Sequence, residues 1–129
     1  MASAQRILVV EDEDVLAQNV KTYLGRRFPD VRIAANGRLA MELLESFVPD
    51  VLVLDFNLPG ENGLQIYAEI MRRRTRPIGC VMITGCPLTK ISGSASDLGI
   101  RHVLGKPFRL AELQRLVDQS AEETSQHSH

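Results

Sequence analysis

The chain has 129 residues, of which 44% are hydrophobic and 24% are charged, as is typical of one soluble globular domain. Fifteen basic residues against sixteen acidic ones give a net charge of −1. This argues against a domain that mainly grips nucleic acid, because phosphate binding needs a basic excess. The apolar runs are far shorter than the roughly 18 residues of a membrane span, and no secretory leader opens the chain. Two cysteines, Cys80 and Cys86, are too few for a disulfide framework and predict a cytoplasmic protein.

Short apolar runs alternate with longer amphipathic stretches along the chain. Strands are expected at residues 7–10, 31–35, 51–54, 79–83 and 101–104. Between them, apolar residues recur at helical spacing, as in Leu39, Leu43, Leu44 and Phe47, where Asn36 can cap the helix. The alternation predicts an α/β domain over residues 1–120, with a parallel sheet covered by helices on both faces.

The residue types of two segments disfavour stable structure. Residues 88–98 should form a helix but contain Gly93 and three serines. A glycine costs about 1 kcal/mol relative to alanine in a helix interior, so this helix is expected to be short, frayed or mobile. Residues 121–129 are polar and show no apolar periodicity, which predicts a disordered tail.

Polar side chains follow four of the predicted strands, at the sheet edge where ligands bind in an open parallel sheet. They are Glu11 and Asp12, Asp55 and Asn57, Thr84, and Lys106. Three neighbouring carboxylates repel one another unless a cation joins them, and carboxylate oxygens suit Mg²⁺. A carboxylate beside the metal can attack phosphorus, while a lysine and a hydroxyl bind the oxygens of the transferred group. The pattern predicts a phosphoryl-accepting site.

The motifs around these residues resemble those of a known family. They are Ile-Leu-Val-Val-Glu11-Asp12, Leu-Asp55-Phe-Asn-Leu-Pro59 with Gly63, Val-Met-Ile-Thr84-Gly85, and Gly-Lys106-Pro107-Phe108 followed by Glu112-Leu113. In this order they resemble the receiver domain of two-component response regulators, over residues 5–119. The resemblance implies a flavodoxin-like, doubly wound sheet of five parallel strands in the order 2-1-3-4-5, with five helices.

The resemblance also implies a role for each matching residue. Asp55 would be the phosphoacceptor, loaded by a histidine kinase or a phosphotransfer protein. Asp12 would bind Mg²⁺ directly and Glu11 through water, and the backbone carbonyl of Asn57 would be a further ligand. Thr84 would be the switch hydroxyl and Lys106 the ion-pair partner of the phosphoryl group, with a cis bond from Lys106 to Pro107.

Such a module is not an enzyme acting on another substrate, although it promotes its own phosphorylation and dephosphorylation. It would switch a partner-binding face of a transcriptional or other response regulator whose output domain lies outside this chain. It would contact neither nucleic acid nor a membrane.

One departure from the family pattern keeps an alternative open. Val103 stands where the family often has an aromatic switch residue, and the neighbouring His102 should point to the other face of the sheet. The alternative is a receiver-like module that binds proteins without being phosphorylated. A phosphohydrolase is disfavoured, because its second acid would stand two residues after Asp55, where this chain has Asn57. The acidic residues after the first strand likewise disfavour a phosphate-bearing cofactor.

Overall fold

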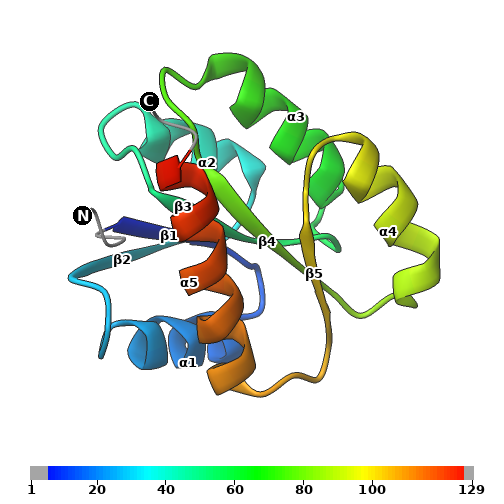
Figure 1. Cartoon of the computed structure of the whole chain (residues 1–129), viewed down its shortest axis with the longest axis horizontal. Helices are drawn as coiled ribbons and strands as arrows, with labels where there is room; N and C mark the ends of the chain where they lie inside the picture. Colours follow the sequence, from blue (N-terminus) through cyan, green and yellow to red (C-terminus); the bar gives the residue numbers. More distant parts are fainter. Residues whose placement is uncertain (1–5, 127–129) are drawn as a thin grey trace.

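In the computed structural model, which describes residues 6–126, helices cover both faces of a central sheet (Figure 1). The strands are β1 (Arg6–Val10), β2 (Asp30–Ala34), β3 (Val51–Asp55), β4 (Gly79–Thr84) and β5 (His102–Gly105). The helices are α1 (Asp14–Leu24), α2 (Gly37–Leu44), α3 (Gly63–Arg73), α4 (Leu88–Asp97) and α5 (Leu110–Gln126). All neighbouring strands pair in parallel, in the order β2-β1-β3-β4-β5. The predicted fold class and strand order are therefore confirmed.

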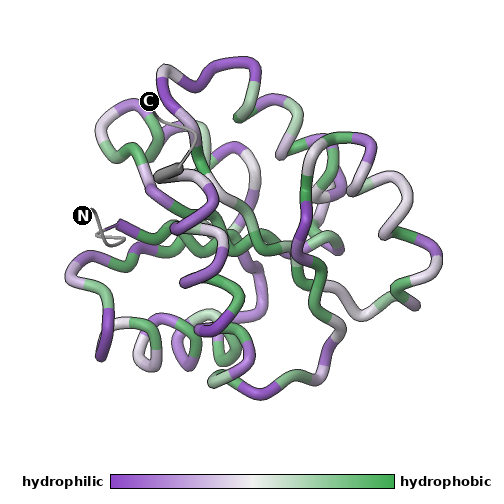
Figure 2. The backbone as a smooth tube through the Cα atoms, in the orientation of Figure 1, coloured by the Kyte–Doolittle hydropathy of each residue, from purple (hydrophilic) through white to green (hydrophobic). Residues whose placement is uncertain are grey.

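The side chains of each strand alternate between two hydrophobic layers. In β3, Leu52 and Leu54 pack in the layer beneath α2, α3 and α4, whereas Val51 and Val53 pack beneath α1 and α5. Every residue of β3 and β4 is buried, and Figure 2 shows the hydrophobic residues along the central strands. Continuous apolar strands of this kind are expected where helices cover both faces of a parallel sheet.

The strand order changes direction between β1 and β3. The chain leaves β1 toward β2 on one side, and it leaves β3 toward β4 on the other. The loops that follow β1 and β3 therefore diverge and open a crevice at the carboxyl ends of these strands. The acidic residues that follow β1 and end β3 lie at this crevice, which is therefore the candidate site.

Helix α5 is longer than the sequence indicated. The prediction of a disordered tail over 121–129 is wrong for residues 121–126, which continue the helix to Gln126. Contacts with β4 and β5 hold this last part of the helix against the sheet. Ser120 is buried, and its hydroxyl lies so near Gly79 of β4 that a β-carbon at position 79 would clash with it. Glu123 pairs with His102 of β5. Residues 127–129 lie outside the described part of the chain.

No helix within residues 6–126 has the length and hydrophobicity that a transmembrane span requires.

Helix α4 forms over Leu88–Asp97, but its sequence stabilises it weakly. Only Ile91 and Ala95 are buried, and no side chain caps its first turn. A β-carbon added at Gly93 would meet no atom within 4 Å. The expectation that this helix is the most mobile of those described remains a prediction.

We expect Gly93→Ala to raise the free energy of unfolding by about 1 kcal/mol, because alanine fits without contact and favours the helix. Gly63→Ala, at the start of α3, is the matched control. Its new β-carbon would lie 2.6 Å from the backbone oxygen of Asp55, so this variant should be destabilised. Urea unfolding of the two variants measures both effects, and a Gly93→Ala variant less stable than wild type would contradict the account of α4.

Candidate functional site

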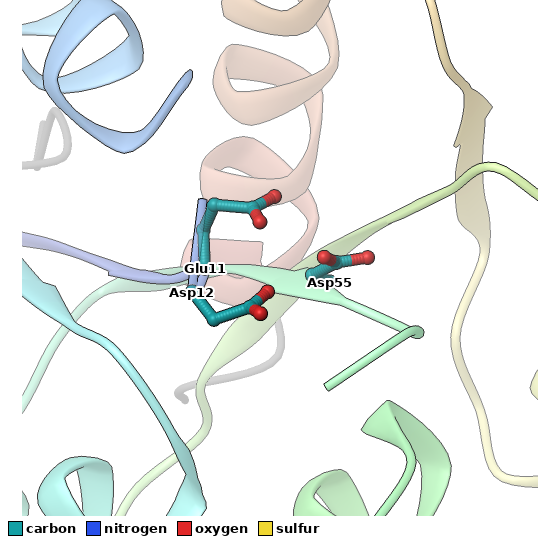
Figure 3. Close-up of side chains that lie close together, drawn as sticks. All are labelled: Glu11, Asp12 and Asp55. Carbon is teal, nitrogen blue, oxygen red and sulfur yellow. The ribbon is translucent and has the colours of Figure 1, made fainter. Parts of the chain in front are cut away.

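Three carboxylates meet in the crevice at the switch point. Glu11 and Asp12 follow β1 directly, and Asp55 is the last residue of the neighbouring strand β3. One oxygen from each lies within 4.8 Å of the others (Figure 3). Glu11 and Asp55 are buried, with exposed fractions of 2% and 1%, whereas Asp12 is exposed. The cluster therefore has two fixed carboxylates at its base and one that faces solvent.

Lys106 contributes the positive charge of the site. Its Nζ lies 3.0 Å from Oε1 of Glu11 and 3.1 Å from Oδ2 of Asp55. The loop after β5 is held by the backbone N–H of Lys106, which donates to the carbonyl of Thr84 at 2.7 Å. Burial on its own would lower the pKa of Lys106, but the two carboxylates outweigh it and raise that pKa above its usual value. Lys106 is therefore a fixed cation at neutral pH.

The surroundings of Glu11 alter its protonation. The pKa of Glu11 is raised from 4.5 to about 7, mainly by burial and to a smaller extent by the charge of Asp55. The backbone N–H of Glu13, which donates to Oε2 at 3.0 Å, and the ammonium of Lys106 act in the opposite direction. The effect of burial on Glu11 therefore outweighs the stabilising contacts with Lys106 and the backbone N–H.

The raised pKa of Glu11 predicts a pH dependence of stability in metal-free protein. Between about pH 4.5 and pH 7 the folded state holds a proton on Glu11 that the unfolded state has lost. Stability from this group therefore falls as the pH rises through that window. We expect the free energy of unfolding of Glu11→Gln, relative to that of wild type, to rise by roughly 2 kcal/mol across this pH range. This is less than the whole pKa difference would give, because water reaches the site.

Urea unfolding at a series of pH values, with a chelator present, measures this difference. Glu13→Gln is the control, because the side chain of Glu13 is exposed. Wild-type and Glu11→Gln curves that stay parallel from pH 4.5 to pH 7 would contradict the assignment.

The other carboxylate oxygen of Asp55 contacts the loop after β3, which in turn bonds to the end of β4. Oδ1 of Asp55 accepts a hydrogen bond from the backbone N–H of Asn57 at 3.0 Å. Thr84, which ends β4 and is fully buried, donates its hydroxyl to Oδ1 of Asn57 at 3.2 Å. The structure thus brings all six predicted site residues into one connected group.

The contacts of the Asn57 side chain were not predicted from the sequence. Only the backbone carbonyl of this residue was assigned a role, whereas its amide side chain bonds to Thr84, Gly85 and Cys86. No local pattern indicates these bonds, because they join loops 27 to 29 residues apart.

Two further predictions about β5 and its loop are confirmed. Val103 packs in the layer beneath α2, α3 and α4, whereas His102 bonds to Glu123 of α5 on the opposite face, at 3.0 Å. The bond between Lys106 and Pro107 is cis.

The donor set of the crevice fits a small, hard divalent cation. All the side-chain ligand atoms are oxygens, one carboxylate faces solvent, and Oε1 of Glu11 is buried with no hydrogen bond, its ion pair with Lys106 aside. Mg²⁺ commonly takes one or two carboxylates and keeps several waters, an arrangement that the exposed position of Asp12 permits.

Comparisons with known proteins agree with the fold. The model of the family described as "Response regulator receiver domain" matches residues 7–118. A CheY-like response regulator receiver domain protein from Methanospirillum hungatei superposes with a TM-score of 0.86 at 22% identity, covering 96% of this chain and 98% of that one. The signal receiver domain of a putative Luxo repressor protein from Vibrio parahaemolyticus has a TM-score of 0.86 at 24% identity, covering 95% and 93%.

A third similar structure holds bound groups. It is a response regulator protein from Burkholderia pseudomallei with a phosphorylated aspartic acid, a calcium ion and citrate. It superposes with a TM-score of 0.80 at 23% identity, covering 95% of this chain and 71% of that one.

Proposed function

This chain belongs to the response regulator receiver domain family, and on that premise we propose that Asp55 accepts a phosphoryl group from the phosphohistidine of a histidine kinase or phosphotransfer protein. One observation carries the proposal. Asp55 is a buried carboxylate at the switch point, with Lys106 on one oxygen and a backbone N–H on the other. As a nucleophile, Asp55 would have beside it groups able to bind the oxygens of a phosphoryl group, which supports the proposal.

In the proposed transfer, an Asp55 carboxylate oxygen forms a bond to phosphorus while the P–N bond to the donor histidine breaks. The imidazole leaves with the electron pair of that bond and takes up a proton from water. Lys106 stays charged throughout and pairs with a phosphoryl oxygen, since its raised pKa keeps the ammonium at neutral pH. Thr84 donates its hydroxyl to another phosphoryl oxygen once it has moved toward the new group.

Asp12 and Asp55 would hold Mg²⁺ directly, Glu11 through water, and the backbone carbonyl of Asn57 would complete the protein ligands. The metal would supply positive charge to the phosphoryl oxygens during the transfer. The phosphorylated aspartate and calcium ion in the Burkholderia pseudomallei relative support this assignment of the acidic group.

The phosphorylated domain would act as a signal rather than as an enzyme on another substrate. The phosphoryl group adds negative charge and acceptor oxygens, which would draw Thr84 inward and shift the loop between β4 and α4. We place the protein in the reducing cytoplasm, where the free thiols of Cys80 and Cys86 persist.

Incubation with acetyl phosphate and Mg²⁺, followed by intact-mass measurement, tests the proposal. We expect one phosphoryl adduct on wild type, none on Asp55→Asn, and an unchanged adduct on Asp97→Asn, where an exposed carboxylate of α4 is removed. No adduct on wild type would favour the phosphorylation-independent alternative. An adduct on Asp55→Asn would place the acceptor elsewhere.

A further inference from the structure

We propose that the side chain of Asn57 is a clasp that holds the Thr84 hydroxyl in its unphosphorylated position, so that phosphorylation must release it. This inference rests on the proposed function of the site. It gives the Asn57 side chain a positioning role that is separate from the metal contact expected of its backbone carbonyl.

The Thr84 hydroxyl both donates and accepts a hydrogen bond in this structure. The hydroxyl donates to Oδ1 of Asn57 at 3.2 Å and accepts from the backbone N–H of Cys86 at 2.9 Å. A hydroxyl has a single proton to donate. Thr84 therefore cannot bind a phosphoryl oxygen on Asp55 while it donates to Asn57.

The orientation of the Asn57 amide is fixed by its neighbours. The backbone N–H of Gly85 lies 3.3 Å from the same atom, Oδ1, and an N–H can only donate. The atom facing Gly85 and Thr84 must therefore be the amide oxygen. The amide nitrogen then points to Sγ of Cys86, to which it donates at 3.4 Å.

The clasp opposes the switch by stabilising one of its two states. A phosphoryl group binds best to the state in which the Thr84 hydroxyl is free to move toward it. Because the clasp stabilises the other state, it weakens the apparent affinity of the protein for a phosphoryl group. A typical net hydrogen bond corresponds to about a fivefold change in such an equilibrium. Removing the clasp should therefore tighten binding of a phosphoryl mimic by about fivefold.

Position 57 suits a direct test. Asn57 is exposed, and its backbone N–H bond to Asp55 does not depend on the side chain. Asn57→Ala removes the acceptor of Thr84 and leaves that backbone bond available. Cys86→Ala removes the sulfur acceptor of the amide nitrogen, and it tests the clasp without changing position 57.

The experiment is calorimetric titration of fluoroberyllate, a phosphoryl mimic, into protein with saturating Mg²⁺. The affinity of each variant for Mg²⁺ alone is measured first, so that any change at the metal is separated from a change at the switch. Four proteins form a double-mutant cycle: wild type, Asn57→Ala, Thr84→Val, and the double variant.

We expect Asn57→Ala to bind fluoroberyllate about fivefold more tightly than wild type, and Cys86→Ala to change the affinity in the same direction by a smaller factor. In the Thr84→Val background, where no hydroxyl is held, Asn57→Ala should have no effect. A purely structural role of Asn57 would instead act equally in both backgrounds.

Failure of the clasp and failure of the proposed function give different results. Wild type that does not bind fluoroberyllate with Mg²⁺ overturns the proposed function, and the clasp with it. Wild type that binds, together with an Asn57→Ala variant of equal or weaker affinity, overturns the clasp alone. Tightening that persists in the Thr84→Val background also overturns it.

Discussion

Mg²⁺ should stabilise the folded protein by about 2.7 kcal/mol when its free concentration is a hundred times its Kd. The reason is electrostatic. Glu11, Asp12 and Asp55 bring three ligand oxygens within 4.8 Å of one another, and Lys106 supplies only one positive charge. The unfolded chain has no such cluster, so the metal binds the folded state preferentially. Thermal unfolding across a Mg²⁺ series measures the effect.

Variants of the cluster distinguish metal binding at this site from a general effect of salt. Asp12→Asn should lose most of the response to Mg²⁺, and Glu11→Gln should lose less, because only Asp12 is assigned a direct bond. Asp14→Asn, which changes an exposed carboxylate in the first turn of α1, should respond as wild type does. A wild-type midpoint that is indifferent to millimolar Mg²⁺, or the reverse order of the two site variants, would contradict the assignment.

Lys106→Met should destabilise the metal-free protein by about 3 kcal/mol at pH 8, because it leaves the carboxylates of Glu11 and Asp55 buried without their cation. The same substitution should tighten Mg²⁺ binding, since it removes a positive charge that lies about 3 Å from both carboxylates. Methionine keeps most of the aliphatic stem, so the charge is the main change.

Chemical unfolding and Mg²⁺ titration of the same samples measure the two effects. Lys90→Met, which removes an exposed lysine from α4, is the control and should change neither. Weaker Mg²⁺ binding by Lys106→Met, or unchanged stability of this variant in metal-free protein, would show that Lys106 does not balance the charge of the cluster.

The sequence predicted the sheet and the position of the site because both depend on short, local patterns. Apolar runs such as 51–54 indicate strands, and parallel strands bring their carboxyl ends to one edge. The same strand pattern therefore predicted both the fold and the site, since these ends carry Glu11, Asp55, Thr84 and Lys106.

The parts that were missed depend on contacts between distant segments. The last part of α5 is polar, and it packs on the sheet through Ser120 against Gly79 and through Glu123 against His102. The side chain of Asn57 bonds to Thr84 at the end of β4 and to Gly85 and Cys86 in the loop that follows. Neither arrangement leaves a periodic pattern, so hydropathy and spacing could not indicate it.

The central claim is that Asp55 is the acceptor of the phosphoryl group, and its most direct measurement identifies the phosphorylated residue itself. Phosphorylated protein is reduced with borohydride, which converts an aspartyl phosphate to homoserine, and the product is sequenced by tandem mass spectrometry. We predict homoserine at position 55 and at no other aspartate. Homoserine at position 12, or reduction at no aspartate of a protein that carries the adduct, would contradict the claim.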